Sequence, residues 1–151
     1  MSGADTYRET RDVPVTSLEP FPGNANRGDL SAIRESIRRS GQYRPLIVRQ
    51  CNDGRMVVLT GNNTLLALRA EGRRTVRCEI HEMDDQTALR VNIGDNHIAR
   101  RAVVDEDLLL DQLSYLDGDY EGTGLTQGHI NAMLGEGGFA ADPEHEISGL
   151  R

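Results

Sequence analysis

The sequence predicts a small α/β (α+β) domain, in which a mixed sheet packs against helices, followed by a short helical appendage. Short apolar runs of strand length alternate along residues 13–101 with stretches of helical spacing. After Val104 the sequence becomes acidic and contains two further helical patterns. We therefore divide the 151-residue chain into a body over 12–104, an acidic helical appendage over 105–135, and a tail over 136–151 that is expected to be mobile.

The body begins with a predicted strand and a predicted helix. Residues 13–18, VPVTSL, alternate as a half-buried strand, and Pro14 places that strand at a sheet edge because proline donates no ladder hydrogen bond. The prolines, glycines and asparagines of 19–29 predict a loop. The helix that follows has Asp29 as its N-cap and Gly41 at its C-terminal end.

A hairpin and a second helix come next. The apolar runs 45–49 and 56–60 flank Asp53-Gly54, a dipeptide that favours the tight turn between antiparallel strands. After the second run, a helix is expected from about 62 to 71.

One strand and three helices complete the predicted order. Residues 75–80 alternate as a strand, and the next helix is capped by Asp84 or Asp85 and extends to about Arg101. The two helices of the appendage are expected at 105–116 and at 125–135, where Thr126 starts the second one.

Charge is distributed unevenly along the chain. The net charge is −7, and all 17 basic residues are arginines. Residues 31–101 carry +5, from thirteen arginines against eight carboxylates, whereas residues 102–151 carry −10, from one arginine against eleven carboxylates. Because phosphate contacts need positive charge, DNA phosphates are expected to contact the Arg-rich body and not the acidic appendage. The acidic part is either a solvated surface or a surface for a protein partner.

Composition excludes several classes of protein. Cys51 and Cys78 form no C-x-x-C pair, so zinc and disulfide frameworks are not expected and both are interpreted as ordinary thiols. No apolar run approaches the roughly 20 residues that span a bilayer. The N-terminus lacks the layout of a signal peptide. We therefore expect a cytoplasmic protein without a membrane partner.

A candidate anion site lies in LTGNNTLLALRAEG, residues 59–72. A strand ends, the backbone turns at Gly61, and a helix begins whose first N–H groups lack helical acceptors and carry the positive end of the helix dipole. Asn62 and Asn63 offer amide donors, and Thr64 offers a hydroxyl. The pattern has two interpretations, a phosphate site or a helix that asparagine simply caps.

Three sequence boxes in this order resemble the N-terminal domain of the ParB family, which has the ParB/sulfiredoxin fold. The resemblance covers residues 12 to about 104. Its boxes correspond to Gly41, Gln42, Pro45, Leu46 and Val48, to Gly61 through Thr64, and to Asp95 and Asn96 with Arg100 nearby.

The resemblance implies nucleotide binding. ParB domains bind CTP as a switch for clamp closure, and other branches of the fold use ATP or ADP in sulfiredoxin and serine-kinase chemistry. A nucleoside triphosphate, CTP or ATP, with Mg²⁺ is therefore the expected ligand, and a homodimer is a further expected assembly. Asp95 is the expected metal ligand, and the expected nucleotide-binding residues are Gly61, Asn62, Asn63, Thr64, Gln42, Arg44, Asn96, His97 and Arg100.

The chain also departs from the family pattern. Thr64 stands where ParB relatives carry arginine, which removes a bidentate phosphate contact and predicts weaker binding, unless Arg69, Arg73, Arg44 or Arg100 supplies the charge. Asn62 falls where sulfiredoxins carry the cysteine of G-C-H-R, so sulfiredoxin chemistry is not expected. GLTQGHINAMLG, at 124–135, resembles the first helix of a helix-turn-helix motif, but no basic second helix follows.

The sequence thus predicts a ParB-like nucleotide-binding protein of phage or plasmid type, associated with DNA partition, modification or processing. One alternative is a Mg²⁺-dependent ParB-like nuclease or a small-molecule kinase, in which Asp95 and Asn96 hold the ion. Another alternative is a nucleotide-free adaptor whose acidic tail binds a protein partner.

Overall fold

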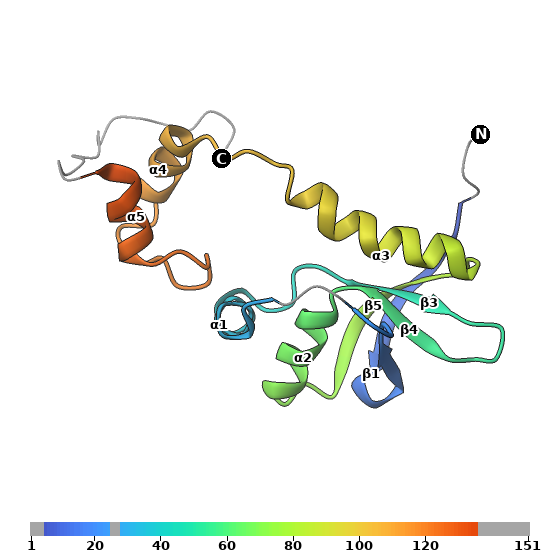
Figure 1. The fold of residues 1–151 in the computed structure, drawn as a ribbon. Coiled ribbons are helices and arrows are strands. Elements are labelled where there is room, and N and C mark those ends of the chain that lie inside the picture. The colour runs from blue at the N-terminus through green and yellow to red at the C-terminus, as the bar shows by residue number, and fades with distance from the viewer. Residues whose placement is uncertain (1–4, 25–27, 136–151) are drawn as a thin grey trace.

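The structure is a computed structural model that describes residues 5–24 and 28–135. That part of the chain contains a five-stranded mixed sheet and five α-helices, of which the last two lie apart from the sheet (Figure 1). The strands are β1 (Tyr7–Pro14), β2 (Leu18–Pro20), β3 (Leu46–Gln50), β4 (Met56–Thr60) and β5 (Thr75–His81). The helices are α1 (Leu30–Ser40), α2 (Asn62–Ala70), α3 (Asp85–Ala99), α4 (Glu106–Ser114) and α5 (Gln127–Leu134).

The sheet has the order β1-β5-β3-β4-β2. β5 pairs antiparallel with β1 and parallel with β3, while β4 pairs antiparallel with β3 and parallel with β2. The predicted fold class, a small mixed sheet with packed helices, is therefore confirmed. The hairpin between β3 and β4 turns where Asp53-Gly54 predicted it.

The predicted strand at 13–18 is wrong. A 3₁₀ turn at Val15–Ser17 divides this segment, so that it ends one strand and begins another on the opposite edge of the sheet. Val13 and Leu18 are both buried in the core, and Val15 packs against it, which explains why the segment alternates like one strand. The residues of β1 before Val13 are exposed and mostly polar or charged, so hydrophobic periodicity gave no signal for them. Pro14 does lie in an edge strand, as predicted.

Local capping signals position the helices. The backbone N–H of Ala32 donates to the Asp29 carboxylate, and Gly41 ends α1 with a φ of 72°. Asp84, and not Asp85, caps α3 by accepting a hydrogen bond from the Thr87 N–H at 2.7 Å. Each of these side chains satisfies a backbone donor that the helix itself leaves unpaired.

The helices cover both faces of the sheet. Leu65 and Leu68 of α2 are fully buried in the cluster that also holds Val58 of β4. Leu59, the residue of β4 that follows Val58, is also buried but lies on the other face of the sheet, where α3 packs. Successive side chains of a strand point to opposite faces. β4 is therefore buried on both faces. This burial fixes the position of its C-terminal end, from which α2 begins.

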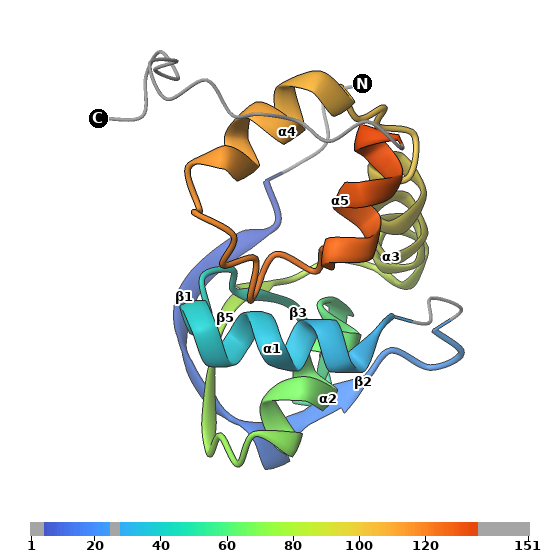
Figure 2. The same ribbon diagram turned by 90° about the vertical axis from the view of Figure 1, so that its left-hand side faces the viewer.

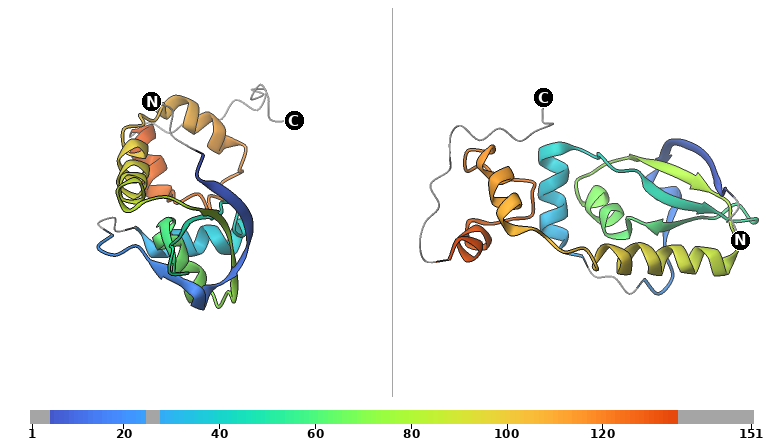
Figure 3. Two further views of the ribbon diagram at one scale, coloured as in Figure 1. Left: turned by 90° about the vertical axis from the view of Figure 1, so that its right-hand side faces the viewer. Right: turned by 90° about the horizontal axis from the view of Figure 1, so that it is seen from above.

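The acidic appendage, residues 105–135, lies on the far side of α1 from the sheet (Figures 2 and 3). The loop between its two helices contacts α1 through an ion pair between Arg39 and Asp119, at 2.6 Å. α4 and α5 bury only Leu113 and Ile130. The tail at 136–151, predicted to be mobile, lies outside the described residues. None of the described helices combines the length and apolar character required to cross a bilayer.

Candidate functional site

The junction between β4 and α2 is built around Gly61. Gly61 is the N-cap of α2 and has a left-handed backbone, with a φ of 91° and a ψ of 22°. A Cβ at this position would lie 2.6 Å from Cδ2 of the buried Leu46, so glycine is required by conformation and by space. The interpretation of this junction as a helix with asparagine as its N-cap is wrong, because the N-cap is Gly61, which has no side chain to make a capping hydrogen bond.

Backbone donors are presented at this helix start. The first helical hydrogen bond runs from the Leu65 N–H to the Gly61 carbonyl, at 2.8 Å. The N–H groups of residues 62–64 therefore have no acceptor within the helix, and they carry the positive end of its dipole. Such a helix start favours an anionic ligand.

Asn62 has a structural role that sequence reasoning missed. Its side chain is buried, with 8% of the residue exposed. The amide nitrogen donates to the Val58 carbonyl at 3.1 Å, and the amide oxygen accepts from the Phe21 N–H at 2.9 Å. The side chain thus ties the loop after β2 to the start of α2. What Asn62 presents to a ligand is its backbone N–H.

A pocket of about 180 Å³ opens over this helix start. Besides residues 59–64, it is lined by Asn24, Gly28, Ile33 and Asn96. It brings together two of the sequence boxes, since Gly61–Thr64 come from α2 and Asn96 comes from α3. A Cβ on Gly28 would lie 2.9 Å from the Asn63 side chain, so the loop before α1 passes very close to this site.

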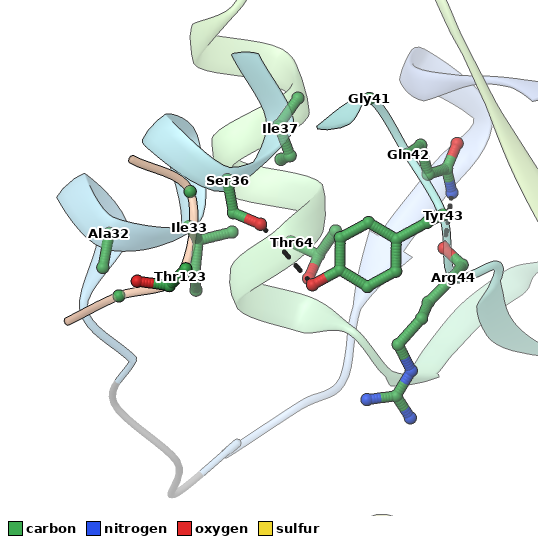
Figure 4. Close-up of a pocket in the computed structure, with 12 residues that line it drawn as sticks. Ala32, Ile33, Ser36, Ile37, Gly41, Gln42, Tyr43, Arg44, Thr64 and Thr123 are labelled. Atoms are coloured by element: carbon green, nitrogen blue, oxygen red, sulfur yellow. Dashed lines mark hydrogen bonds between the residues drawn. The ribbon is translucent and has the colours of Figure 1, made fainter. Parts of the chain in front are cut away.

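A larger pocket of about 300 Å³ adjoins the first (Figure 4). Its walls come from α1, from Thr64, from the segment 41–44 that enters β3, and from residues 122–124 of the appendage. Both pockets are lined by Ile33 and Thr64. We call the two pockets together the groove. The groove joins all three sequence boxes, with Thr64 at the point where the pockets meet.

The two predicted residues of the first box differ in what they offer. The Gln42 amide nitrogen donates to the Arg77 and Arg44 carbonyls, and its oxygen accepts from the Arg77 N–H at 3.0 Å. Gln42 therefore fastens the segment before β3 to β5. The exposed Arg44 guanidinium makes no hydrogen bond or ion pair within the described part of the chain, and it is the cation available to a ligand in the larger pocket.

Only one predicted residue of α3 lines the groove. Asn96 does so and donates to the Asn92 carbonyl at 3.0 Å. Asp95, His97 and Arg100 are exposed and line neither pocket, because neighbouring residues of a helix point in directions about 100° apart. Asn92, which the sequence analysis missed, is buried and donates to the Leu59 carbonyl at 2.8 Å. This bond holds α3 against the end of β4.

Of the four arginines expected to replace the missing family arginine, only Arg44 lines the groove. Arg69 donates from one guanidinium nitrogen to the carbonyls of Val15 and Leu18, both at 2.9 Å. It therefore fastens α2 to the turn between β1 and β2. Arg73 follows the C-terminal end of α2, opposite to the helix start that forms the groove.

Neither cysteine takes part in the groove. Cys78 is fully buried in β5, and this burial raises the pKa of its thiol to about 11. A thiol with such a pKa is protonated near neutral pH. Within residues 5–24 and 28–135, His, Cys, Asp and Glu side chains form no cluster of three or more that could hold a metal ion.

Comparison with known proteins decides the family. The sequence model of the ParB N-terminal domain matches residues 4–97, more than half of the chain. The chain belongs to the ParB N-terminal domain family. The resemblance found in the sequence is thereby confirmed. A search among curated proteins gives no match.

Solved structures agree with this family. The C-terminally truncated chromosome-partitioning protein ParB from Caulobacter crescentus, complexed with CTPγS, is 25% identical, with a TM-score of 0.61 over 84% of this chain and 71% of that chain. The same protein complexed to the centromeric parS site is 24% identical, with a TM-score of 0.50 over 82% of this chain and 64% of that chain. A Pnob8-like ParB-N domain is 20% identical, with a TM-score of 0.53, and this chain spans 42% of it. The last two likenesses show the fold alone.

Proposed function

We propose that this protein binds a nucleoside triphosphate in the groove and acts in DNA partition, modification or processing, as a ParB-type protein of phage or plasmid origin. The observation that carries the proposal is the groove itself, where the boxes around Gln42, Gly61 and Asn96 meet although they lie far apart in the sequence. CTP is the favoured nucleotide, because a ParB of similar fold binds a CTP analogue.

The phosphates are placed at the start of α2. There the backbone N–H groups of 62–64 supply donors without any cost of side-chain ordering. The Thr64 hydroxyl and the Asn96 amide line the same space. Thr64 is a weaker phosphate ligand than the family arginine, because it offers neither positive charge nor a bidentate pair of donors. We therefore expect weak affinity, with Arg44 as the main source of charge.

Mg²⁺ would enter with the nucleotide. The two pockets offer amide and hydroxyl oxygens but no carboxylate among their lining residues, whereas a protein site for Mg²⁺ normally supplies one or two carboxylates. The phosphates and water are then the main ligands of the ion. Asp95, next to Asn96 on α3, is the carboxylate proposed to approach it, with His97 on the same helix and Arg100 at the C-cap of that helix.

The arginines of α1 are already paired with carboxylates. Arg34 lies 2.6 Å from Glu71, and Arg38 lies 3.7 Å from the same carboxylate. Arg39 pairs with Asp119, as described above. Contact with DNA through this face would require these arginines to exchange partners, and we therefore propose it as a secondary and salt-sensitive property.

The test is isothermal titration of the protein with CTP, ATP, GTP and ADP in the presence of Mg²⁺. We expect heat of binding with CTP, reduced in Arg44→Gln because that change removes a charge from the groove. Arg74→Gln is the matched control, since Arg74 is an exposed arginine that does not line the groove. If none of the four nucleotides gives heat, the proposal is wrong and the adaptor alternative is favoured. Cleavage of DNA that depends on Mg²⁺ would instead favour the nuclease alternative, and Mg²⁺-dependent transfer of a phosphate from the nucleotide to a small molecule would favour the kinase alternative.

A further inference from the structure

The loop between α4 and α5 makes a specific contact with α1. This loop, residues 117–124, is here called the appendage loop. Its Gly122 N–H donates to the Glu35 carboxylate at 2.9 Å, and its Asp119 carboxylate lies 2.6 Å from the Arg39 guanidinium. The two contacts involve two different residues of α1, one acidic and one basic. The loop is therefore held in one register against the helix.

Gly122 allows the close approach. Its φ of 83° lies in the left-handed region, where other residues are strained. A Cβ at this position would lie 2.9 Å from Cβ of Arg39 and 3.6 Å from Cα of Ser36, so the loop backbone rests directly on the helix surface. Both the conformation and the space at Gly122 fit this docked arrangement.

Docking of the loop completes the larger pocket. Gly122, Thr123 and Gly124 form a wall of that pocket, and Ile33 and Ser36 of α1 line it beside them (Figure 4). The Thr123 hydroxyl is used within the loop, where it donates to the Tyr120 carbonyl at 2.6 Å. The wall facing a ligand is thus made largely of small residues, and it disappears if the loop leaves α1.

The contact is suited to reversible closure. The side chains of Arg39 and Asp119 are 54% and 51% exposed, so water and salt weaken their attraction. The acidic loop meets α1 at Arg39, which pairs with Asp119, so opposite charges favour the return of the loop to the same place after each opening.

We propose that the appendage loop is a latch of the nucleotide site, which docks on α1 and closes the larger pocket around the nucleoside part of the ligand. Docking of the loop and occupancy of the pocket then stabilise each other, because the ligand contacts the loop only in the docked state. This inference rests on the proposed function. It gives the acidic appendage a role inside the binding site.

The test uses the full chain and two loop variants. Gly122→Ala introduces the clashing Cβ and should undock the loop. Glu121→Gln is the control, since it alters a neighbouring exposed carboxylate that makes no ion pair in the described part of the chain. Binding of CTP with Mg²⁺ is measured by titration calorimetry, and protection of the loop amides is measured by hydrogen exchange with and without CTP. Circular dichroism and thermal unfolding verify that each variant keeps the fold of the body.

We expect CTP to slow exchange in the loop of the wild type and of Glu121→Gln. Gly122→Ala should show fast loop exchange and binding that is weaker by about fivefold or more. If Gly122→Ala binds CTP as tightly as the wild type while its loop exchanges fast, the latch is wrong and the proposed function stands. The latch is also wrong if CTP leaves exchange in the wild-type loop unchanged. If the wild type gives no heat with any nucleotide, the proposed function and the latch are both wrong.

Discussion

The body and the appendage are held in place by different forces. The hydrophobic core cluster lies entirely within residues 13–80, and it includes side chains from all five strands and from α1 and α2. In the described part of the chain, the appendage buries Leu113 and Ile130 and contacts the body through a half-exposed ion pair and a hydrogen bond from a backbone N–H to the Glu35 carboxylate. Burial of apolar surface stabilises the body strongly, whereas contacts of the second kind are weak and sensitive to salt. The difference suggests that the body forms a rigid half of the groove and that the appendage adds a movable wall.

The largest loss of stability is expected for a leucine-to-alanine substitution in the body, and the same substitution in the appendage tests the difference between the two regions. Leu65→Ala removes a fully buried side chain of α2 and should cost roughly 2–5 kcal/mol of unfolding free energy, because it leaves a cavity. Leu108→Ala, in α4, removes a side chain that is 51% exposed and should cost about 0.5 kcal/mol or less. Urea unfolding followed by circular dichroism measures both. Equal losses would show that the appendage is part of the same core.

Asn62→Ala should have the next largest effect. The change leaves the buried Val58 carbonyl and the Phe21 N–H without their partner, and an unsatisfied buried group costs roughly 1–3 kcal/mol. Asn131→Ala is the control, since Asn131 is exposed on α5 and accepts one hydrogen bond from Gln127. Thermal unfolding compares the two variants. A loss below that of Asn131→Ala would mean that the Asn62 side chain is free to serve a ligand.

Thr64→Arg should strengthen nucleotide binding in the groove. The new guanidinium would enter the place where the pockets meet and restore the charge that ParB relatives carry. A charge-assisted hydrogen bond is worth roughly 1.5–3 kcal/mol, which corresponds to about tenfold or more in affinity. Titration with CTP and Mg²⁺ measures the gain. Leu66→Arg adds the same charge at an exposed position of α2 outside the groove and should give no gain. Equal affinity in Thr64→Arg and in the wild type would argue against phosphates at this helix start.

Truncation after residue 104 should change the stability of the body only slightly. All of the core cluster remains, and in the described part of the chain the appendage meets the body through the loop contacts to α1. We expect a cooperative thermal transition close to that of the full chain, and circular dichroism of the shortened protein measures it. An unfolded product would show that the body depends on the appendage.

Sequence reasoning predicted what local signals determine. Asp29, the Asp53-Gly54 turn and Thr126 each act on backbone groups within three residues of themselves. The start of β1 left no such signal, because this edge strand is exposed and polar before Val13.

The missed features of the groove depend on contacts between distant residues. Asn62 accepts its hydrogen bond from a residue 41 positions away, and Arg39 pairs with a residue 80 positions away. No periodicity in the sequence reports such contacts. The three boxes were predicted to form one site because of the family resemblance. Of the residues predicted on α3, only Asn96 lines the groove in the structure, because the side chains next to it on the helix point in other directions.

The smallest expected effect is a pH dependence at the cap of α3. Hydrogen bonds from the side chain and the backbone N–H of Thr87 hold the pKa of Asp84 below its ordinary value of 3.8. The folded state therefore binds this proton less readily than the unfolded state. The stabilisation is present above pH 3.8 and is lost as the pH falls through the lowered pKa.

Asp84→Asn keeps a capping oxygen but does not titrate. The unfolding free energies of the wild type and this variant should thus differ most above about pH 5 and converge in acid. Guanidinium unfolding from pH 6 down to about pH 3 measures the effect, and curves that stay parallel would mean that the Asp84 carboxylate gains nothing from Thr87.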